Sequence, residues 1–316
     1  MRVLVTGGAG FIGSHLVDHL IERGEDVRVL DNLSGGSLSN LGRWRGDPRL
    51  EFVQGDLLNP AEVEAAVEGC DAVYHLAANP EVRTWRASPE DHFRQNIEAT
   101  YNLLEALRKR GDAESLVFTS SSTVYGEAAL LPTPEEYAPL KPISIYGASK
   151  LAAGGLVSAY ASMYGFRSVI YRMANVVGPR SGHGVIHDFM EKLRRNPREL
   201  EVLGDGTQSK SYLYVGDCVE GMVLGAEEAD KPVEVFNIGS EDRVNVRTIA
   251  RIVIEEMGLS GVEVRLTGGV EGGRGWKGDV KLMQLDTFRL RSLGWSPRLG
   301  SAEAVRETAR ELARGG

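Results

Sequence analysis

Short runs of apolar and β-branched residues alternate with longer stretches of helical periodicity through the first 172 residues. The expected strands are 2–6, 26–30, 51–54, 71–77 and 115–120, and the expected helices are 11–23, 60–69 and 90–110. Strands that alternate with helices pair in parallel, so this pattern predicts a doubly wound α/β sheet. A helix at 144–164 and a strand at 168–172 would extend the same sheet.

The pattern changes after residue 172. Residues 173–316 contain Gly- and Pro-rich turns, short strands and scattered helices, and a strand pattern returns at 233–237. We therefore expect an α/β fold with a Rossmann-type cofactor-binding domain at 1–172, which 215–240 rejoins. A smaller α/β C-terminal lobe, at 173–214 and 241–316, would bind the substrate.

Composition narrows the classes of partner. The chain has 36 Lys and Arg against 44 Asp and Glu, a net charge of −8, which argues against nucleic acid and anionic membranes as partners. Its two cysteines, Cys70 and Cys218, are far apart and form no zinc-type cluster, and His15 and His19 lack a third ligand, so we expect no metal site. Met1 leads directly into the first strand pattern, so we expect no signal peptide and a cytoplasmic protein.

A glycine-rich segment follows the first predicted strand and opens the first predicted helix. It places Gly7, Gly10 and Gly13 where small residues let the backbone approach a pyrophosphate and where a helix N-terminus supplies N–H donors. Asp31 ends the second strand, where a carboxylate accepts hydrogen bonds from ribose hydroxyls and repels a 2′-phosphate. The segment therefore predicts NAD rather than NADP as cofactor.

Further cofactor contacts are expected at the glycine segment and at the ends of the following strands. Asp56 either accepts hydrogen bonds near the adenine or is an ordinary acid at a strand end. The other expected contacts are Phe11, Ile12, Asn32, Leu57, Leu76, Ala77 and Ala78.

Tyr146 and Lys150 are four residues apart, so on a helix they share one face. A phenol with a pKa of about 10 works as a base near neutrality only if nearby positive charge lowers that pKa, and Lys150 together with oxidised nicotinamide could do so. Ser121 ends the fifth strand, where its hydroxyl could bind both the substrate oxygen and the phenolate. Ser120 and Ser122 remain alternative donors.

Together these motifs resemble the extended short-chain dehydrogenase/reductase family and, within it, the UDP-glucose (UDP-galactose) 4-epimerases. The resemblance covers nearly the whole chain. It is carried by TGGAGFIGSHL at the start, DNLS at 31–34, SSSTVYG at 120–126, YGASK at 146–150, RMANVVGPR at 172–180, GDGTQSKSYLYVGD at 204–217 and LGWSP at 293–297.

The resemblance implies that Ser121, Tyr146 and Lys150 are catalytic and that Asn96 helps to hold NAD. Tyr146 would take the proton of the sugar 4-hydroxyl while tightly bound NAD accepts the hydride from C4; the 4-keto sugar would then rotate and be reduced on its other face. A homodimer through the helices at 90–110 and 144–164 is also implied. The implied substrate contacts are Ser121, Ser122, Asn175, Val185, Lys210, Arg274 and Asp279.

The chain departs from the epimerase pattern at several places. Lys210 stands where the family usually has Arg, which loses the bidentate fork, and Arg274 is displaced from the usual spacing before Gly-Asp. Met283, where epimerases have a residue that gates the sugar 2-position, leaves the choice of UDP-hexose open.

Three other functions stay open. They are an epimerase acting on UDP-N-acetylglucosamine or UDP-glucuronate, a 4,6-dehydratase or decarboxylase, and a non-catalytic NAD-binding protein. Dehydratases need an acidic pair where this chain has Ser122 and Thr123, which favours epimerisation. A protein that only binds NAD has no need of the Ser-Tyr-Lys set.

Overall fold

The structure, a computed structural model, describes residues 1–83 and 87–314. The chain divides into two compact units. The first comprises Met1–Val124, Ile145–Arg172 and Met222–Phe236, and the second comprises Tyr125–Ser144, Met173–Gly221 and Asn237–Gly316. The segment 125–144, which the sequence pattern placed in the first domain, therefore groups with the second unit. Positions 84–86 and 315–316 of the two predicted domains lie outside the described residues.

The first half of the chain alternates strands and helices, as its periodicity predicts. The region expected as one helix at 90–110 is three consecutive segments, the middle one a π-helix, Phe93–Glu98. The elements are β1 (Arg2–Thr6), α1 (Phe11–Glu22), β2 (Asp26–Asp31), a 3-10 helix (Leu38–Trp44), β3 (Leu50–Gln54), α2 (Pro60–Val67), β4 (Ala72–His75), α3 (Pro89–His92), α4 (Ala99–Arg110), β5 (Ser115–Ser121), a 3-10 turn (Ser122–Tyr125), α5 (Ile145–Tyr164) and β6 (Arg167–Met173).

The main sheet has seven strands in the order β11-β6-β5-β4-β1-β2-β3, where β11 is Val233–Ile238. Strand β1 pairs in parallel with both β2 and β4. The chain order reverses between these two neighbours of β1, and in doubly wound sheets a ligand binds outside the carboxyl ends of the strands at such a reversal. The fold class predicted from the sequence is confirmed.

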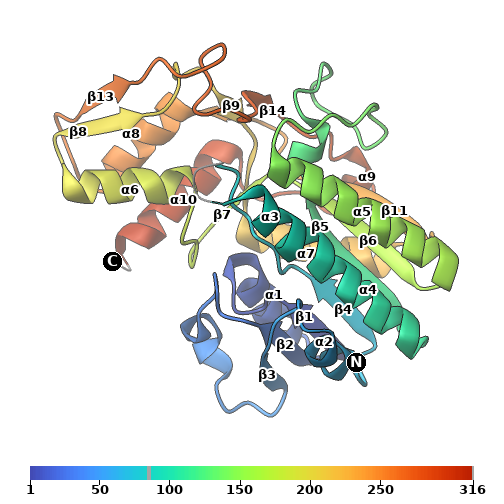
Figure 1. Ribbon diagram of the computed structural model, residues 1–316. Coiled ribbons are helices and arrows are strands. Elements are labelled where there is room, and N and C mark those ends of the chain that lie inside the picture. The colour runs from blue at the N-terminus through green and yellow to red at the C-terminus, as the bar shows by residue number, and fades with distance from the viewer. Residues whose placement is uncertain (84–86, 315–316) are drawn as a thin grey trace. The chain divides into compact units, whose positions relative to one another are not determined.

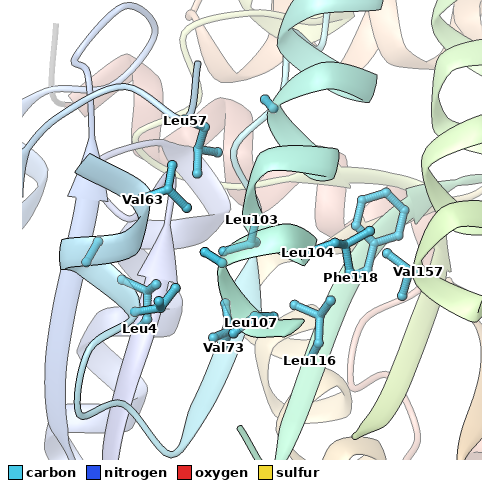
Figure 2. Close-up of a cluster of buried hydrophobic side chains, with 14 of the residues drawn as sticks. Leu4, Leu57, Val63, Val73, Leu103, Leu104, Leu107, Leu116, Phe118 and Val157 are labelled. Atoms are coloured by element: carbon cyan, nitrogen blue, oxygen red, sulfur yellow. The ribbon is translucent and has the colours of Figure 1, made fainter. Parts of the chain in front are cut away.

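The core of this sheet is a continuous apolar layer between strands and helices. Figure 2 shows Leu4, Val73 and Leu116, from neighbouring strands, facing Leu103 and Leu107 of α4. Strands buried on both faces need near-continuous apolar sequence, which explains the apolar runs at residues 3–5 of β1 and 72–74 of β4. The packed layer fixes where each strand ends, and therefore where the loops that carry the site residues begin.

The remaining elements follow β6 in the chain. They are β7 (Asn175–Val177), α6 (Val185–Arg195), β8 (Glu199–Val202), β9 (Ser209–Lys210), β10 (Tyr212–Tyr214), α7 (Val215–Glu228), β12 (Val244–Asn245), α8 (Val246–Glu256), β13 (Glu263–Leu266), β14 (Leu282–Met283), α9 (Phe288–Arg291) and α10 (Ser301–Arg314) (Figure 1). Small sheets form from β10-β7, β12-β9-β14 and β13-β8. Helices α6, α8 and α10 share a second apolar core with β8.

Neither a membrane span nor a metal cluster occurs in the described residues. No helix within 1–83 and 87–314 combines the length and apolarity that crossing a bilayer requires. Across the same residues, no three His, Cys, Asp or Glu side chains group so as to hold a metal ion.

A buried guanidinium closes the C-terminal end of α2. Arg28, on β2, is 9% exposed, and its Nη1 donates to the carbonyl oxygens of Ala66 at 2.9 Å and Glu68 at 2.7 Å. Its Nε donates to Glu51 at 2.9 Å. The last carbonyls of a helix have no partner within the helix, so Arg28 satisfies groups that burial would otherwise leave unpaired.

We predict that Arg28→Met lowers the free energy of unfolding by about 2–4 kcal/mol, because it leaves buried carbonyls and Glu51 without their donor. Urea denaturation measures the change. The matched control is Arg195→Met, whose side chain is 81% exposed and should cost about 0.5 kcal/mol or less. Equal effects of the two substitutions would show that the buried contacts contribute nothing.

Candidate active site

The glycine loop between β1 and α1 is closely packed by backbone. A Cβ on Gly7 would lie 2.7 Å from the nitrogen of Ala77, and Gly7 has a φ of +71°. A Cβ on Gly13 would lie 2.2 Å from the carbonyl oxygen of Gly7. These two glycines are therefore required by the turn and by the approach of the chain that follows β4.

Gly10 has a different environment. Among the described residues, and apart from its chain neighbours, a Cβ there would meet only the Gly7 carbonyl oxygen, at 3.1 Å. Gly10 is also the N-cap of α1, where no side chain caps the helix and no acidic residue lies in its first turn. The N–H groups of that turn, which belong to residues such as Phe11 and Ile12, thus keep their capacity to bind an anion. The loop fits the pyrophosphate of a dinucleotide.

Asp31 is tied to the glycine loop. Its Oδ2 accepts a hydrogen bond from the N–H of Ala9 at 3.0 Å, and its Oδ1 accepts one from Leu33 at 2.8 Å. Each carboxylate oxygen can accept a second bond, so the residue can hold the loop and still bind ribose hydroxyls, the role expected from the sequence. Asp31 lies at the carboxyl end of β2 and is 8% exposed.

Of the cofactor contacts expected near the third strand, Asn32 and Asp56 lie together, whereas Leu57 lies in the apolar core. Asn32 donates from Nδ2 to Asp56 at 3.0 Å, so these two predicted residues lie together. Leu57 is buried in the core shown in Figure 2, so its side chain packs against protein rather than facing a ligand. Its carbonyl also accepts a hydrogen bond from Asn102.

The segment after β4 is anchored to the end of β1. The N–H of Leu76 donates to the Thr6 carbonyl at 3.1 Å, and that of Ala77 lies 3.3 Å from Thr6 Oγ1. Buried His75 bridges Thr6 Oγ1, at 2.7 Å, and Thr100 Oγ1, at 3.0 Å. Burial lowers the pKa of His75 to about 3, so the ring is neutral at pH 7 and holds these hydroxyls without a charge.

Ser121 and Tyr146 meet in the first unit. Ser121 ends β5 and Tyr146 lies in the first turn of α5, and the Ser121 hydroxyl is close enough to the phenol to lower its pKa. Burial raises the pKa of the Tyr146 phenol to about 12, and the Ser121 hydroxyl opposes this rise. The sequence predicts that Lys150 and oxidised nicotinamide lower this pKa together, and that expectation stays a prediction.

Lys150 is itself desolvated. Its Nζ donates to the Thr119 carbonyl at 2.9 Å and lies 5.0 Å from the centre of the Phe118 ring. Burial lowers the pKa of Lys150 to about 7, because the charged form loses hydration, so at neutral pH much of it is uncharged. A cation near the phenol must therefore come from elsewhere, and the oxidised nicotinamide of NAD has the right charge.

Asn96 is committed to protein contacts. It is 2% exposed; its Oδ1 accepts from the N–H of Asn79 at 2.7 Å, and its Nδ2 donates to the Asn79 carbonyl at 3.2 Å and to Ser149 Oγ at 2.9 Å. It fixes the chain after β4 against the residue preceding Lys150. These contacts use both Nδ2 hydrogens and one Oδ1 lone pair, and the expected contact of Asn96 with NAD stays a prediction.

Sequence reasoning assigned no role to two residues beside the catalytic set. His92 packs edge-on against the Tyr146 ring, with 6.1 Å between ring centres, and burial lowers its pKa. Thr123 contacts Ser121 through both its backbone N–H and its hydroxyl. His92 stands outside every motif, 54 positions before Tyr146, and Thr123 stands inside SSSTVYG, where the motif gives no hint of its contacts.

In the second unit, three predicted substrate contacts form one charged cluster. Lys210 Nζ lies 2.6 Å from Asp279 Oδ1 and 5.5 Å from the centre of the Trp276 ring. Arg274 donates from Nε to the Asp279 carbonyl at 3.1 Å and forms an ion pair with Glu127. Both cations thus have carboxylate partners, with which a bound diphosphate would compete.

Three further residues of the second unit, among them two predicted contacts, are placed less directly. Asn175 donates from Nδ2 to the Ser211 carbonyl at 3.2 Å, next in the chain to Lys210. Val185 is the first residue of α6 and is partly buried. Met283 pairs with Lys210 in the β14–β9 ladder and is buried, which agrees with a packing role.

We predict opposite outcomes for two glycine substitutions. Gly10→Ala should leave stability nearly unchanged and weaken NAD binding on the order of tenfold, because its methyl group would occupy the anion's side of the loop. Gly13→Ala should lower the free energy of unfolding by about 1–3 kcal/mol, because its Cβ would overlap the Gly7 carbonyl. Calorimetric titration with NAD and urea denaturation measure these effects.

The control is Gly42→Ala, where an added Cβ meets nothing within 4 Å and φ is not positive. It should change neither quantity. If Gly10→Ala binds NAD as tightly as the unchanged protein, the loop does not hold the pyrophosphate.

Comparison with known proteins places the chain in a family. The family model described as "NAD dependent epimerase/dehydratase family" matches residues 3–239. A crystal structure of a UDP-galactose 4-epimerase is 47% identical, with a TM-score of 0.87, and the match covers 100% of this chain and 99% of that one.

Two curated proteins are also similar over most of their length. A putative UDP-glucose 4-epimerase of Methanocaldococcus jannaschii is 34% identical over 96% of both chains. UDP-glucuronic acid decarboxylase 3 of Arabidopsis thaliana is 33% identical over 96% of this chain and 87% of its own. The chain therefore belongs to the NAD-dependent epimerase/dehydratase family, and its cofactor is NAD.

Proposed function

We propose that this protein interconverts UDP-galactose and UDP-glucose by oxidising and re-reducing the sugar at C4. The observation that carries the proposal is the placement of Ser121, at the end of β5, beside the Tyr146 phenol on the helix that also carries buried Lys150. A protein that only binds NAD has no use for a phenol held in this way. The 47% identity to a UDP-galactose 4-epimerase supports the choice of sugar.

Each side chain has a definite task in this reaction. Tyr146 takes the proton of the sugar 4-hydroxyl and later returns it, and Ser121 donates a hydrogen bond to the oxygen that loses it. When bound, NAD supplies the acceptor for the electron pair of the C4–H bond and gives it back. Asn96 and Ser149 keep the helix that carries Tyr146 in register with the chain after β4.

Inversion at C4 requires that the sugar present both faces to the same residues. The nucleotide must then be held firmly while the sugar turns about its diphosphate link. We propose that Lys210 and Arg274 hold the diphosphate and that Asp279 orients Lys210, in a domain for nucleotide-sugar binding formed by the second unit. Val185 and Asn175 would line the same binding region, and Ser122 would contact the sugar.

A second reaction is favoured by one observation. The similarity to a UDP-glucuronic acid decarboxylase makes UDP-glucuronate an alternative substrate. Against a 4,6-dehydratase, by contrast, Ser122 and Thr123 supply no carboxylate next to Ser121. Such a side chain would be needed to expel a 6-substituent in a dehydratase.

We predict that the purified protein converts UDP-galactose into a mixture with UDP-glucose without added cofactor and without net NADH. Proton NMR of the anomeric signals follows the conversion. Tyr146→Phe should lower kcat by about 10²–10⁴-fold while NAD stays bound, because only the proton acceptor is lost.

Tyr160→Phe is the matched control. It removes a phenol from the same helix, one that donates to Glu105 at 2.7 Å, and should leave turnover unchanged. Release of carbon dioxide and a UDP-pentose from UDP-glucuronate would instead identify a decarboxylase. Full activity of Tyr146→Phe would remove this residue from the mechanism.

We also propose a homodimer through α4 and α5, which run side by side in Figure 1. Large apolar side chains are exposed on these helices and on the π-helix before α4: Phe93, Tyr101, Met163 and Tyr164. Gathered apolar side chains of this kind mark interfaces.

We predict that Met163→Glu, at a side chain 72% exposed, dissociates the dimer, because a desolvated carboxylate would face an apolar partner. Sedimentation velocity measures the mass. Phe288→Glu, at a side chain 65% exposed on α9, should leave the mass unchanged. A monomeric unmodified protein would refute the proposal.

A further inference from the structure

Thr123 holds the Ser121 hydroxyl by two contacts. The backbone N–H of Thr123 lies 3.2 Å from Ser121 Oγ, and the Thr123 hydroxyl donates to the same oxygen at 2.9 Å. A serine hydroxyl has two acceptor lone pairs and one proton. With both lone pairs occupied, only the proton of Ser121 remains to form a further bond.

The direction of that remaining bond matters for the chemistry. If Ser121 could rotate freely, it could accept a hydrogen bond from the neutral Tyr146 phenol, which would stabilise the protonated form. Because Thr123 fills its lone pairs, Ser121 instead donates to Tyr146, and a donor stabilises the phenolate. When substrate is bound, this single proton can be donated to the substrate oxygen instead, where it favours the negative charge that develops as that oxygen loses its proton.

We propose that Thr123 is a positioning residue that makes Ser121 a fixed hydrogen-bond donor to the reacting oxygens. The inference rests on the proposed function, because it requires that Ser121 and Tyr146 act in the reaction. The local structure explains how Thr123, two positions after Ser121, can reach the Ser121 hydroxyl. Ser121 ends β5, and the 3-10 turn Ser122–Tyr125 folds Thr123 back onto it.

The groups that face the Tyr146 phenol come from three elements. Ser121 reaches it from the end of β5, His92 packs against its ring from α3, and Lys150 lies one turn further along α5. His92 and Lys150 titrate in all variants of Thr123, so a change that follows the Thr123 hydroxyl is separable from their titration.

The test compares Thr123→Val with Thr123→Ser in the full chain. Valine keeps the side-chain volume and the backbone N–H but has no hydroxyl, and serine restores the hydroxyl. For Thr123→Val we expect kcat to fall about tenfold, with KM for the UDP-sugar changed less than about twofold. The acid limb of the kcat–pH profile should move to higher pH, because a phenolate with a weaker donor binds its proton more tightly.

Two controls separate positioning from simple stability. Thr308→Val deletes a buried hydroxyl that donates to Ala304 within α10, and it should leave kcat and the pH profile unchanged. In a Ser121→Ala background, Thr123→Val should have no further effect on kcat, because Thr123 acts through the removed hydroxyl. Thr123→Ser should recover kcat to within about twofold of the unchanged protein.

Three results would overturn the inference: a Thr123→Val profile that coincides with that of the unchanged protein, a Thr123→Ser variant as impaired as Thr123→Val, or additive losses in the double variant. Should Thr123→Val fail to fold, Thr123→Ala is measured against Thr123→Ser in the same way. Retained turnover in Tyr146→Phe would instead defeat the proposed function itself, so the two failures are distinct.

Discussion

The Ser121 hydroxyl at the carboxyl end of β5 acts on the Tyr146 phenol in the first turn of α5, and the chemistry depends on whether Ser121 donates or accepts there. The phenol is desolvated, and burial, opposed by Ser121, raises its pKa to about 12. Desolvation also lowers the pKa of Lys150 to about 7. The site alone therefore favours uncharged forms of both groups. A cationic cofactor and a directed donor are what could shift the proton, which makes acid–base chemistry conditional on bound NAD.

The glycine loop and its neighbours are arranged so that NAD can bind. Gly7 and Gly13 are small because backbone lies against them, whereas Gly10 faces a side of the loop where few protein atoms lie. An uncapped helix N-terminus adds unpaired N–H donors there. Asp31 holds the loop through the Ala9 N–H while keeping acceptor capacity for a ribose. One carboxylate thus links the shape of the loop to the recognition of the dinucleotide.

In the second unit, two cations are paired with carboxylates. Lys210 is paired with Asp279, and Arg274 with Glu127, so the cations expected to hold a diphosphate are already neutralised. Such pairing keeps partly buried cations from being left without partners. A substrate diphosphate would therefore exchange ion pairs rather than form them from hydrated charges. The lysine at 210 offers a single ammonium instead of a fork, and Trp276 beside it restricts where that ammonium can lie.

The sequence by itself determined the fold class, the cofactor and the family, because these depend on local patterns. Strand periodicity, the glycine spacing at 7, 10 and 13, and Tyr146 four residues before Lys150 are all readable along the chain. The sequence could not show that Asn96 forms hydrogen bonds with Asn79 and Ser149, or that Leu57 belongs to the apolar core. Both facts depend on packing between segments that are distant in the chain.

The state of the protons was likewise decided only by the tertiary structure. The pKa of a group depends on its desolvation and on the direction of its hydrogen bonds. The spacing of residues along the chain predicts neither of these. The sequence predicts positive charge from Lys150 and oxidised nicotinamide together, and only the fold shows that burial lowers the pKa of Lys150 to about 7. Thr123 stands in the SSSTVYG motif, but only the fold shows its two contacts with Ser121 Oγ.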